Sequence, residues 1–306
     1  MALRHTSLRR LRAFEAVARL GSFSRAAAEL HLTQPAVSMQ LRQLEQEIGL
    51  PLVEQMGRRL DVTPAGREIV DCARAVAARL REAEEAIAEL QGRGGGELAI
   101  STVSTAKYHV PMLLAEFRRR HPNVQVRLSV SNREAVVRDL AENTIDLAIM
   151  GTPPRRLDTT AVAFAKHPIA IIAAPGHPLA RRKRVALARL GGETFLIRER
   201  GSGTRSAMER FFSARRFRPR ETIEMSSNET IKQAVMAGMG VSFLSLHTVA
   251  LELQAKRLFV LHVDGTPVMR AWHVIHRERK RLSPVAQAFK AFLIERGAKA
   301  IAQALE

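Results

Sequence analysis

The sequence predicts a chain of class α + α/β, in which a small helical domain and a long helix precede a larger α/β region. Over residues 1–62, short segments with helical spacing are broken by glycine and turn residues. Residues 63–91 carry one long helical pattern, which ends at the glycine-rich hinge GRGGG of residues 92–96. From residue 97 to residue 306, strand-like and helix-like segments alternate, as in α/β domains with a largely parallel sheet.

The composition favours a folded, cytoplasmic protein of two or three domains. The 306 residues are 46% apolar, which excludes disorder of the whole chain. No apolar run approaches the roughly 20 residues of a membrane-spanning helix, and the N-terminus lacks the apolar stretch of a secretory signal. The one cysteine, Cys72, excludes an internal disulfide and fits a reducing compartment. We expect no membrane partner.

The net charge of +18 indicates an anionic partner, but it does not by itself predict DNA binding. Residues 94–306 hold 34 Lys and Arg against 18 acidic residues, so most of the excess lies outside the helical domain. Basic runs such as RRKR at residues 181–184 are commonly solvated surface.

The helical domain has the pattern of a helix-turn-helix. A first helix closes at Gly21, Ser24 can cap a second short helix over SRAAAEL, and HLT makes the turn. Thr33 caps a third helix with Pro35 in its first turn, where the missing N–H and the fixed φ of proline do no harm. Gly49 ends this helix.

The third helix has an apolar face toward the core and a polar face that begins at its N-terminal tip. In a helix-turn-helix, side chains at this tip reach base edges in the major groove. The alternative is an ordinary three-helix core with an indifferent polar face. The segment EQMGRRLDVT at residues 54–63 favours DNA binding, because a β turn-back with Arg58 and Arg59 at its tip suits a wing on the phosphate backbone or in the minor groove.

Residues 63–91 carry a heptad seam that begins after Thr63 and Pro64, a good helix start. The seam residues recur at alternating spacings of four and three and are Ile69, Ala73, Val76, Leu80, Ala83, Ile87 and Leu90. One alternative is a lone amphipathic helix packed on its own domain. A coiled-coil dimer is favoured, because it would present two recognition helices to a two-fold symmetric site.

The stretch RRLRAFEAVARLGSFSRAAAELHLTQPAVSMQLRQLEQEIGLPLVEQMGRRLDVTPAGRE resembles the winged helix-turn-helix of LysR-type transcriptional regulators, and the similarity covers nearly the whole chain. Within the α/β region, DLAIMGTPP, RERGSGTRSAMERFF, MSSNETIKQAVMAGMGVSFLSLHTVALEL and RLSPVAQAFKAFL resemble the Calvin-cycle subgroup, the RuBisCO operon activators. The resemblance implies a homo-oligomer, a dimer or tetramer, that binds promoter DNA and contacts RNA polymerase.

The resemblance also implies base contacts by the first turns of the third helix, with Arg58 in the wing. Many family members carry an arginine at the position of Met39, whose thioether offers only apolar contact, so more weight falls on Arg42 and Arg58. The predicted DNA-binding residues are Ser24, Thr33, Gln34, Pro35, Ser38, Met39, Arg42, Arg58 and Arg59.

The family's C-terminal half is similar to periplasmic binding proteins, in which two α/β subdomains joined by two crossover strands enclose a ligand cleft. We expect the crossovers near residues 163–169 and 267–272. Subdomain I would then comprise residues 97–166 and 270–306, and subdomain II residues 167–269.

Four turns rich in hydroxyl and amide side chains are expected to meet at this cleft: TVSTAK, SNRE, GSGTR and SSNET. Each would open a helix, whose free N–H groups and positive dipole end favour an anion, and Arg205 could grip a carboxylate or phosphate. The predicted effector-binding residues are Ser104, Thr105, Lys107, Asn132, Arg133, Thr152, Ser202, Gly203, Thr204, Arg205 and Asn228. The resemblance makes the ligand a small anionic co-inducer such as a phosphorylated sugar, phosphoenolpyruvate or a nucleotide cofactor; no metal is expected.

Other functions are weaker interpretations. Ser104 and Lys107 match the Ser-x-x-Lys of penicillin-interacting serine enzymes, but the partner motifs are missing. A solute-binding protein would need an export signal, and an architectural DNA-binding protein would not need the α/β region. The main alternative is a LysR-type regulator of amino-acid or aromatic-acid metabolism with a carboxylate co-inducer.

Overall fold

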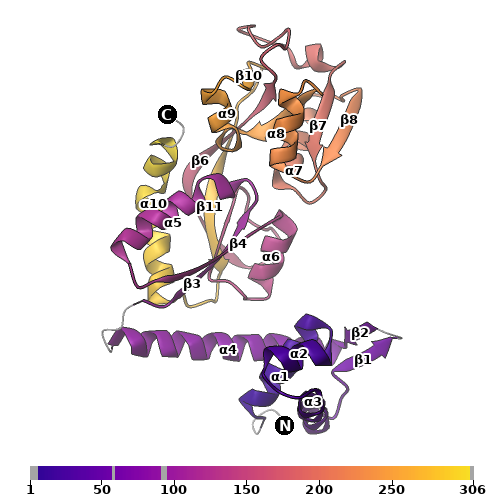
Figure 1. Ribbon diagram of the computed structural model, residues 1–306, viewed down its shortest axis with the longest axis vertical. Helices are drawn as coiled ribbons and strands as arrows, with labels where there is room; N and C mark the ends of the chain where they lie inside the picture. Colours follow the sequence, from indigo (N-terminus) through magenta and orange to yellow (C-terminus); the bar gives the residue numbers. More distant parts are fainter. Residues whose placement is uncertain (1–5, 57–58, 91–94, 304–306) are drawn as a thin grey trace. The chain divides into compact units, whose positions relative to one another are not determined.

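The computed structural model describes residues 6–56, 59–90 and 95–303 (Figure 1). The chain divides into two compact units, Met1–Glu84 and Glu85–Glu306. The first unit is helical with a small two-stranded sheet, and the second is built on one nine-stranded sheet. Among the described residues, no helix is long and apolar enough to cross a membrane.

The first unit is a three-helix core followed by a wing and a long helix. Its elements are α1 (Leu8–Leu20), α2 (Phe23–Glu29), α3 (Gln34–Ile48), β1 (Val53–Met56), β2 (Arg59–Val62) and α4 (Pro64–Leu90), whose last residues belong to the second unit. The hydroxyl of Thr33 accepts a hydrogen bond from the first turn of α3, which contains Pro35. Gly49 ends α3 in the left-handed conformation, at a φ of 77°. The predicted start and end of this helix are therefore confirmed.

The prediction that Ser24 caps the second helix is wrong. Helix α2 begins at Phe23, and Ser22 supplies the cap by accepting a backbone N–H bond of 3.3 Å. Both serines could serve as caps, so packing decides between them. Phe23 contacts the core of the unit, and this frame leaves Ser24 exposed in the first turn.

The predicted turn-back is present as an antiparallel pair in which Met56 of β1 opposes Arg59 of β2. Arg58, predicted at its tip, lies outside the described residues, as does the side chain of Arg59. Residues 91–94, which include most of the predicted hinge, are also outside them.

The first turns of helix α4 are packed in the core of the first unit, whereas a later turn is exposed. Thr63 caps its start, with a bond of 3.0 Å from the Gly66 N–H. Ile69 and Ala73 are buried in the core of the first unit, so this part of the predicted seam packs on its own domain. Farther along, the side chain of Ile87 is 54% exposed. The interpretation of a lone helix therefore holds for the start of α4, while its later turns leave apolar surface uncovered.

The second unit alternates strands and helices, as predicted from the sequence. Its elements are β3 (Glu97–Val103), the 3₁₀ helix η2 (Ala106–Tyr108), α5 (Val110–Arg120), β4 (Gln125–Ser131), α6 (Arg133–Ala141), β5 (Leu147–Met150), β6 (Thr159–Ala173), η3 (Leu187–Leu190), β7 (Thr194–Arg198), α7 (Gly203–Ser213), β8 (Glu221–Met225), α8 (Asn228–Met236), β9 (Val241–Ser245), η4 (Leu246–Thr248), α9 (Ala250–Gln254), β10 (Phe259–Leu261), β11 (Val268–Arg277) and α10 (Pro284–Gln303).

Two long strands at the centre of the sheet connect its two halves. The strand order is β4-β3-β5-β11-β6-β9-β7-β8, with β10 paired to β6. Strands β3 and β7 run parallel to their neighbours, but β6 and β11 are antiparallel to each other and to theirs. The sheet is thus parallel on both sides and antiparallel in the middle, where both predicted crossovers lie.

Each half of the sheet is covered by helices on both faces. In the first half, α5 and α10 pack on one face and α6 on the other; in the second half, α7 and α8 take the two faces (Figure 1). The main apolar cluster of the first half contains Trp272 and Phe289, and that of the second contains Phe195 and Phe243. The boundaries drawn from the sequence at residues 166–167 and 269–270 stay predictions.

Candidate functional site

Two surfaces emerge as candidates, and the first is the exposed face of α3. Val37, Leu41 and Leu44 are buried against α1, which turns the opposite face of the helix to the outside. On that face Gln34, Pro35 and Arg42 are exposed, Met39 is 56% exposed and Ser38 is half-buried. The helix therefore offers a polar and apolar surface of the kind that reads base edges.

The amide of Gln34 is held in place by its neighbour one turn away. Its Nε2 donates to Ser38 Oγ at 2.9 Å. This bond leaves the amide oxygen of Gln34 and the hydroxyl hydrogen of Ser38 for an outside partner. Thr33 is exposed beside them, although its hydroxyl already caps the helix.

The second candidate is a small cavity in the second unit. Eight of the eleven predicted effector-binding residues line it: Ser104, Thr105, Asn132, Arg133, Thr152, Ser202, Gly203 and Thr204. They come from turns after β3, β5 and β7 and from the N-termini of α6 and α7. Asn132 and Ser202 cap those helices, so the positive ends of two helix dipoles face the cavity.

Two cations in the cavity wall have no acidic partner among the described residues. Arg133 donates to the carbonyl of Pro153 at 3.2 Å and contacts Met150 Sδ. Arg270 donates to the carbonyl of Gly203 at 3.2 Å and to the hydroxyl of Thr152. Burial lowers the pKa of both guanidinium groups, that of Arg270 to about 10, and the nearby charge of Arg210 lowers both further.

Buried cations that lie close together without acidic partners are typical of an anion-binding site. Each buried charge repels the others and lacks its full hydration, so a bound anion would relieve both penalties. A structural ion pair would already contain the carboxylate. The wall is therefore suited to a phosphate or a carboxylate supplied by a ligand.

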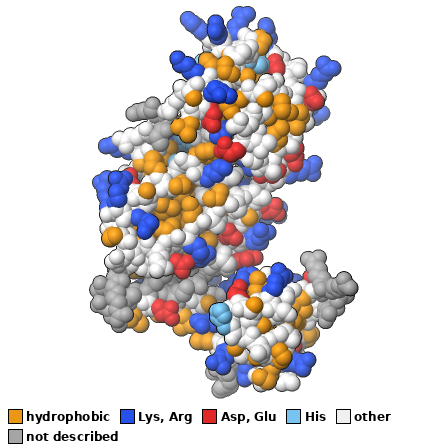
Figure 2. Space-filling view, in the orientation of Figure 1, with side chains coloured by type: hydrophobic (Ala, Val, Ile, Leu, Met, Phe, Trp, Pro, Cys, Tyr) orange, Lys and Arg blue, Asp and Glu red, His pale blue; other side chains and the backbone are white. Residues whose placement is uncertain are grey.

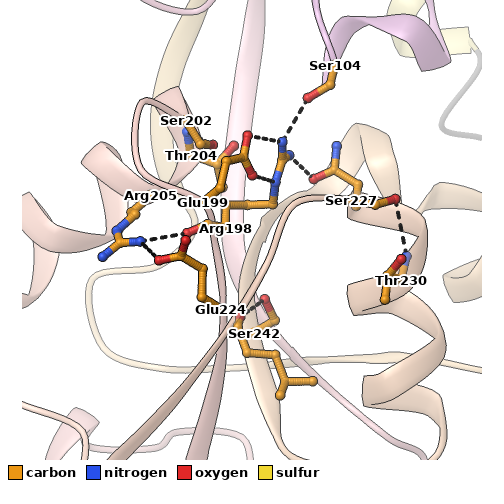
Figure 3. Close-up of polar contacts among 12 residues, drawn as sticks. Ser104, Arg198, Glu199, Ser202, Thr204, Arg205, Glu224, Ser227, Thr230 and Ser242 are labelled. Carbon is orange, nitrogen blue, oxygen red and sulfur yellow. Dashed lines mark hydrogen bonds and ion pairs between the residues drawn. The ribbon is translucent and has the colours of Figure 1, made fainter. Parts of the chain in front are cut away.

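Arg198 is a third arginine in the wall, and it is already neutralised. It donates to both carboxylate oxygens of Glu199, at 2.7 and 2.9 Å, and to Ser104 Oγ at 3.1 Å (Figure 3). Asn228 does not line the cavity; its side-chain oxygen accepts from Arg198 instead. Asn228 is predicted as an effector-binding residue, and in the structure it contacts Arg198 instead of the cavity.

Two further predicted effector-binding residues lie outside this cavity. Arg205 does not line the cavity; it pairs with Glu224 (Figure 3) and also with Glu209, so its charge is already balanced. It is the third residue of α7, and the turn of the helix carries it to the outer side. Lys107 lies outside the cavity as well, with its Nζ 3.8 Å from Glu229. It belongs to the 3₁₀ helix η2, because the first of the four turns does not open an α-helix directly.

Sequence reasoning missed Arg198, Arg270 and His167, which lie in strands and not in turns. His167 of β6 stacks on Trp272 with ring centroids 3.9 Å apart, and both of its nitrogens are buried without a partner. Gly151 permits this arrangement, since a Cβ there would lie 2.9 Å from His167 Nδ1. The signal available in the sequence was a charged residue within an otherwise apolar strand, as in FLIR and VMRAWHVI.

Comparison with known families identifies the domain type of each of the two regions that carry these surfaces. Residues 8–67 match the model of the bacterial regulatory helix-turn-helix protein, lysR family, and residues 91–298 match that of the LysR substrate binding domain. The chain belongs to the LysR family of transcriptional regulators. The predicted fold, DNA-binding character and effector-binding domain are therefore confirmed at the level of the family.

The relatives of this LysR-type regulator include a regulator of the RuBisCO operon. A RuBisCO operon transcriptional regulator of Allochromatium vinosum is 51% identical over 96% of this chain and 98% of its own length. The regulator CfxR of Cupriavidus necator is 47% identical over 97% and 94%. Among solved structures, the CcmR regulatory domain of Synechocystis in complex with 2-PG is 37% identical, with a TM-score of 0.63 over 65% of this chain and 96% of that one. The predicted resemblance to this subgroup is confirmed.

A serine-enzyme function is excluded by family membership and by the positions of the two residues that suggested it. Ser104 Oγ accepts from Arg198, whereas Lys107 pairs with Glu229, so the lysine does not activate the serine. Within the described part of the chain, no three His, Cys, Asp or Glu side chains gather as a metal site.

Replacing Gln34 with alanine is expected to lower the affinity of this regulator for its operator about tenfold, since a side chain that reads a base edge is worth ~1–3 kcal/mol. The dependence of affinity on salt should stay unchanged, because no charge is removed. Fluorescence anisotropy at several salt concentrations measures both quantities. Gln46→Ala, the same change farther along the exposed face of α3, is the control. Equal losses in the two variants would contradict base reading by Gln34.

Proposed function

We propose that this LysR-type regulator activates carbon-dioxide-fixation (RuBisCO) genes in response to a small anionic, phosphorylated metabolite. The observation that carries the ligand proposal is the pair Arg133 and Arg270, two cations without acidic partners in the described residues around one cavity. The names of the Allochromatium and Cupriavidus relatives and the 2-PG complex of the Synechocystis neighbour support the choice of regulon and ligand class.

The ligand's anionic group would lie between the two arginines and the N-terminus of α7. Arg133 begins α6, which packs on the first half of the sheet, whereas Ser202 to Thr204 form the start of α7, which packs on the second half. Arg270 lies on the crossover strand β11 and already reaches the carbonyl of Gly203. One anion can therefore bind groups of both halves at once, with charge-assisted bonds that are stronger than neutral ones.

A ligand that bridges two halves favours the arrangement in which both sets of donors reach it. The effector would thus shift the population of the second unit between two arrangements, and the change would pass to the DNA through the assembled oligomer. Winged domains would bind a partly palindromic promoter site, with Gln34, Pro35, Ser38 and Met39 at the bases. Contact with RNA polymerase would then depend on the effector.

The oligomer is proposed to form through the exposed later turns of α4. Ile87→Asp is expected to weaken the dimer at least 100-fold, because a carboxylate in an apolar seam loses its hydration without a partner. Analytical ultracentrifugation measures the mass at low micromolar concentration. Ala75→Asp adds the same charge at an exposed position off the seam and should leave the mass unchanged. A dimer that survives Ile87→Asp would place the interface elsewhere.

The regulon is tested by deletion of the gene in its own organism. The transcript of the RuBisCO genes should fall during growth on carbon dioxide and recover when the wild-type gene is returned. Complementation with the Gln34→Ala variant should recover less. An unchanged RuBisCO transcript in the deletion strain would favour the alternative, a LysR-type regulator of another pathway.

A further inference from the structure

A second cavity in the second unit, of about 400 Å³, shares no lining residue with the first. It lies among η2, α8, η4, α9 and the C-terminal turn of α10, and its inner wall includes His109 and His247. Both rings contact Trp272, the tryptophan on which His167 of the first cavity stacks. Trp272 thus has a neighbour in each cavity.

The hydrogen bonds of the two histidines are incomplete. His247 Nδ1 accepts from Trp272 Nε1 at 2.9 Å, so the proton of the neutral ring lies on Nε2, which makes no hydrogen bond within the described part of the chain. His109 is only 2% exposed, and neither of its ring nitrogens has a partner. Burial lowers the pKa of His109 to about 3 and that of His247 to about 4, so both rings are neutral at pH 7. The wall therefore offers one N–H from His247 and a donor and an acceptor from His109.

The outer rim of this cavity carries balanced charges that are already paired. Lys232 Nζ lies 2.7 Å from Glu252 and 2.9 Å from Glu229, and the hydroxyl of Tyr108 donates to Glu229. Lys107 Nζ lies 3.8 Å from Glu229, so both ammonium groups near this rim already face carboxylates, which disfavours an anion. The second cavity thus differs in chemistry from the first, where the arginines lack acidic partners.

We propose that the second cavity binds a small uncharged molecule with a planar ring and an amide or an equivalent donor–acceptor pair. The ring would lie against the apolar part of the wall, formed by Ala250, Leu251 and Ile301. The polar group would supply the missing bonds of His109 and His247. The two buried nitrogens of His109, which have no partner among the described residues, make this recognition selective, because a ligand that lacks the polar pair leaves them unsatisfied.

Occupancy of one cavity is expected to alter the other through Trp272. A ligand that moves the ring of His109 or His247 also moves the tryptophan that supports His167 in the wall of the first cavity. Any such coupling is reciprocal, so each ligand changes the affinity for the other by the same factor. The regulator would then respond both to an anionic ligand in the first cavity and to an uncharged ligand in the second.

Trp272 is the one tryptophan of the sequence and is fully buried, so its fluorescence reports both cavities in the full-length protein. Nicotinamide is the probe, and nicotinate, which has the same ring with a carboxylate, is its matched control. Nicotinamide should change the Trp272 emission saturably and bind at least tenfold more tightly than nicotinate. His109→Phe, which keeps a ring and removes both nitrogens, should weaken nicotinamide binding about tenfold.

Two variants separate this site from the first cavity. Ala250→Phe, which fills the rim from a half-buried position, should also weaken nicotinamide binding. Arg270→Gln should abolish binding of phosphorylated anions but keep that of nicotinamide. The experiment can therefore contradict one of the two proposals while it supports the other. Absence of saturable nicotinamide binding, equal affinity for nicotinate, or indifference to both His109→Phe and Ala250→Phe would each overturn the second site.

Discussion

The variant Arg270→Gln is expected to lose at least 100-fold in affinity for the phosphorylated effector while its folded state becomes more stable. Loss of one partner from a buried, hydrogen-bonded charge pair removes ~2–5 kcal/mol of binding free energy. The folded state becomes more stable because the substitution removes a buried cation. That cation faces Arg133 and Arg210 and has no acidic partner in the described residues. Glutamine can still donate to Thr152 or to the carbonyl of Gly203.

Opposite changes in binding and stability distinguish this result from misfolding. Calorimetry measures the affinity for whichever of ribulose bisphosphate, phosphoenolpyruvate, NADPH and 2-PG the wild type binds most tightly, and thermal denaturation measures stability. Arg205→Gln removes the same charge from a residue held by Glu209 and Glu224 outside the cavity, and its effector affinity should stay within about twofold of wild type. If Arg205→Gln lost the effector and Arg270→Gln kept it, the cavity would be wrongly assigned.

The second unit is expected to lose stability steeply in mild acid. His109 and His247 have folded-state pKa values of about 3 and about 4, below the ordinary value of 6.5 for the unfolded chain. The unfolded chain therefore takes up protons that the folded chain does not. Full stability is present above pH 6.5 and is lost as the pH falls toward 4. At pH 5 each of these two histidines lowers the free energy of unfolding by about 2 kcal/mol relative to neutral pH. Burial also lowers the pKa of His167, which adds to the loss.

The loss is measured by the Trp272 emission during thermal unfolding at pH 7 and pH 5. A loss of about 4 kcal/mol from the two histidines corresponds to a fall of about 10 °C in melting temperature for a unit of this size. His109→Phe should lose about half as much on acidification. His262→Gln, a change at an exposed histidine, should behave as the wild type. A melting temperature that does not respond to pH between 7 and 5 would contradict the buried neutral state of these rings.

Local backbone rules made the first unit predictable. Thr33, Pro35 and Gly49 each satisfy a requirement of one helix end, and these requirements hold whatever surrounds the helix. The cap of α2 was misplaced because Ser22 and Ser24 are equivalent locally, and only the packing of Phe23 chooses between them. In the second unit the short edge strand β8 and the three-residue β10 were missed, since neither has an apolar run long enough to stand out.

The effector cavity was predictable where it is built from turns and not where it is built from strands. Asn132 and Ser202 begin helices at the ends of parallel strands, a position that sequence spacing reveals. Arg198 and Arg270 come from strands, and only the pairing of β11 with β5 brings Arg270 beside Thr152. Arg205 lies outside the cavity, which the sequence could not show, because the direction of a side chain on a helix depends on how the helix packs.

The central claim, that a phosphorylated metabolite in the first cavity controls DNA binding, is tested most directly by fluorescence anisotropy. The labelled DNA is the intergenic segment beside the protein's own gene, titrated at fixed salt with and without ribulose bisphosphate, phosphoenolpyruvate, NADPH and 2-PG. We predict specific binding whose affinity changes at least fivefold with one of these compounds, in the wild type and not in Arg270→Gln. Specific binding that none of the four compounds alters, or an equal response in Arg270→Gln, would contradict the claim.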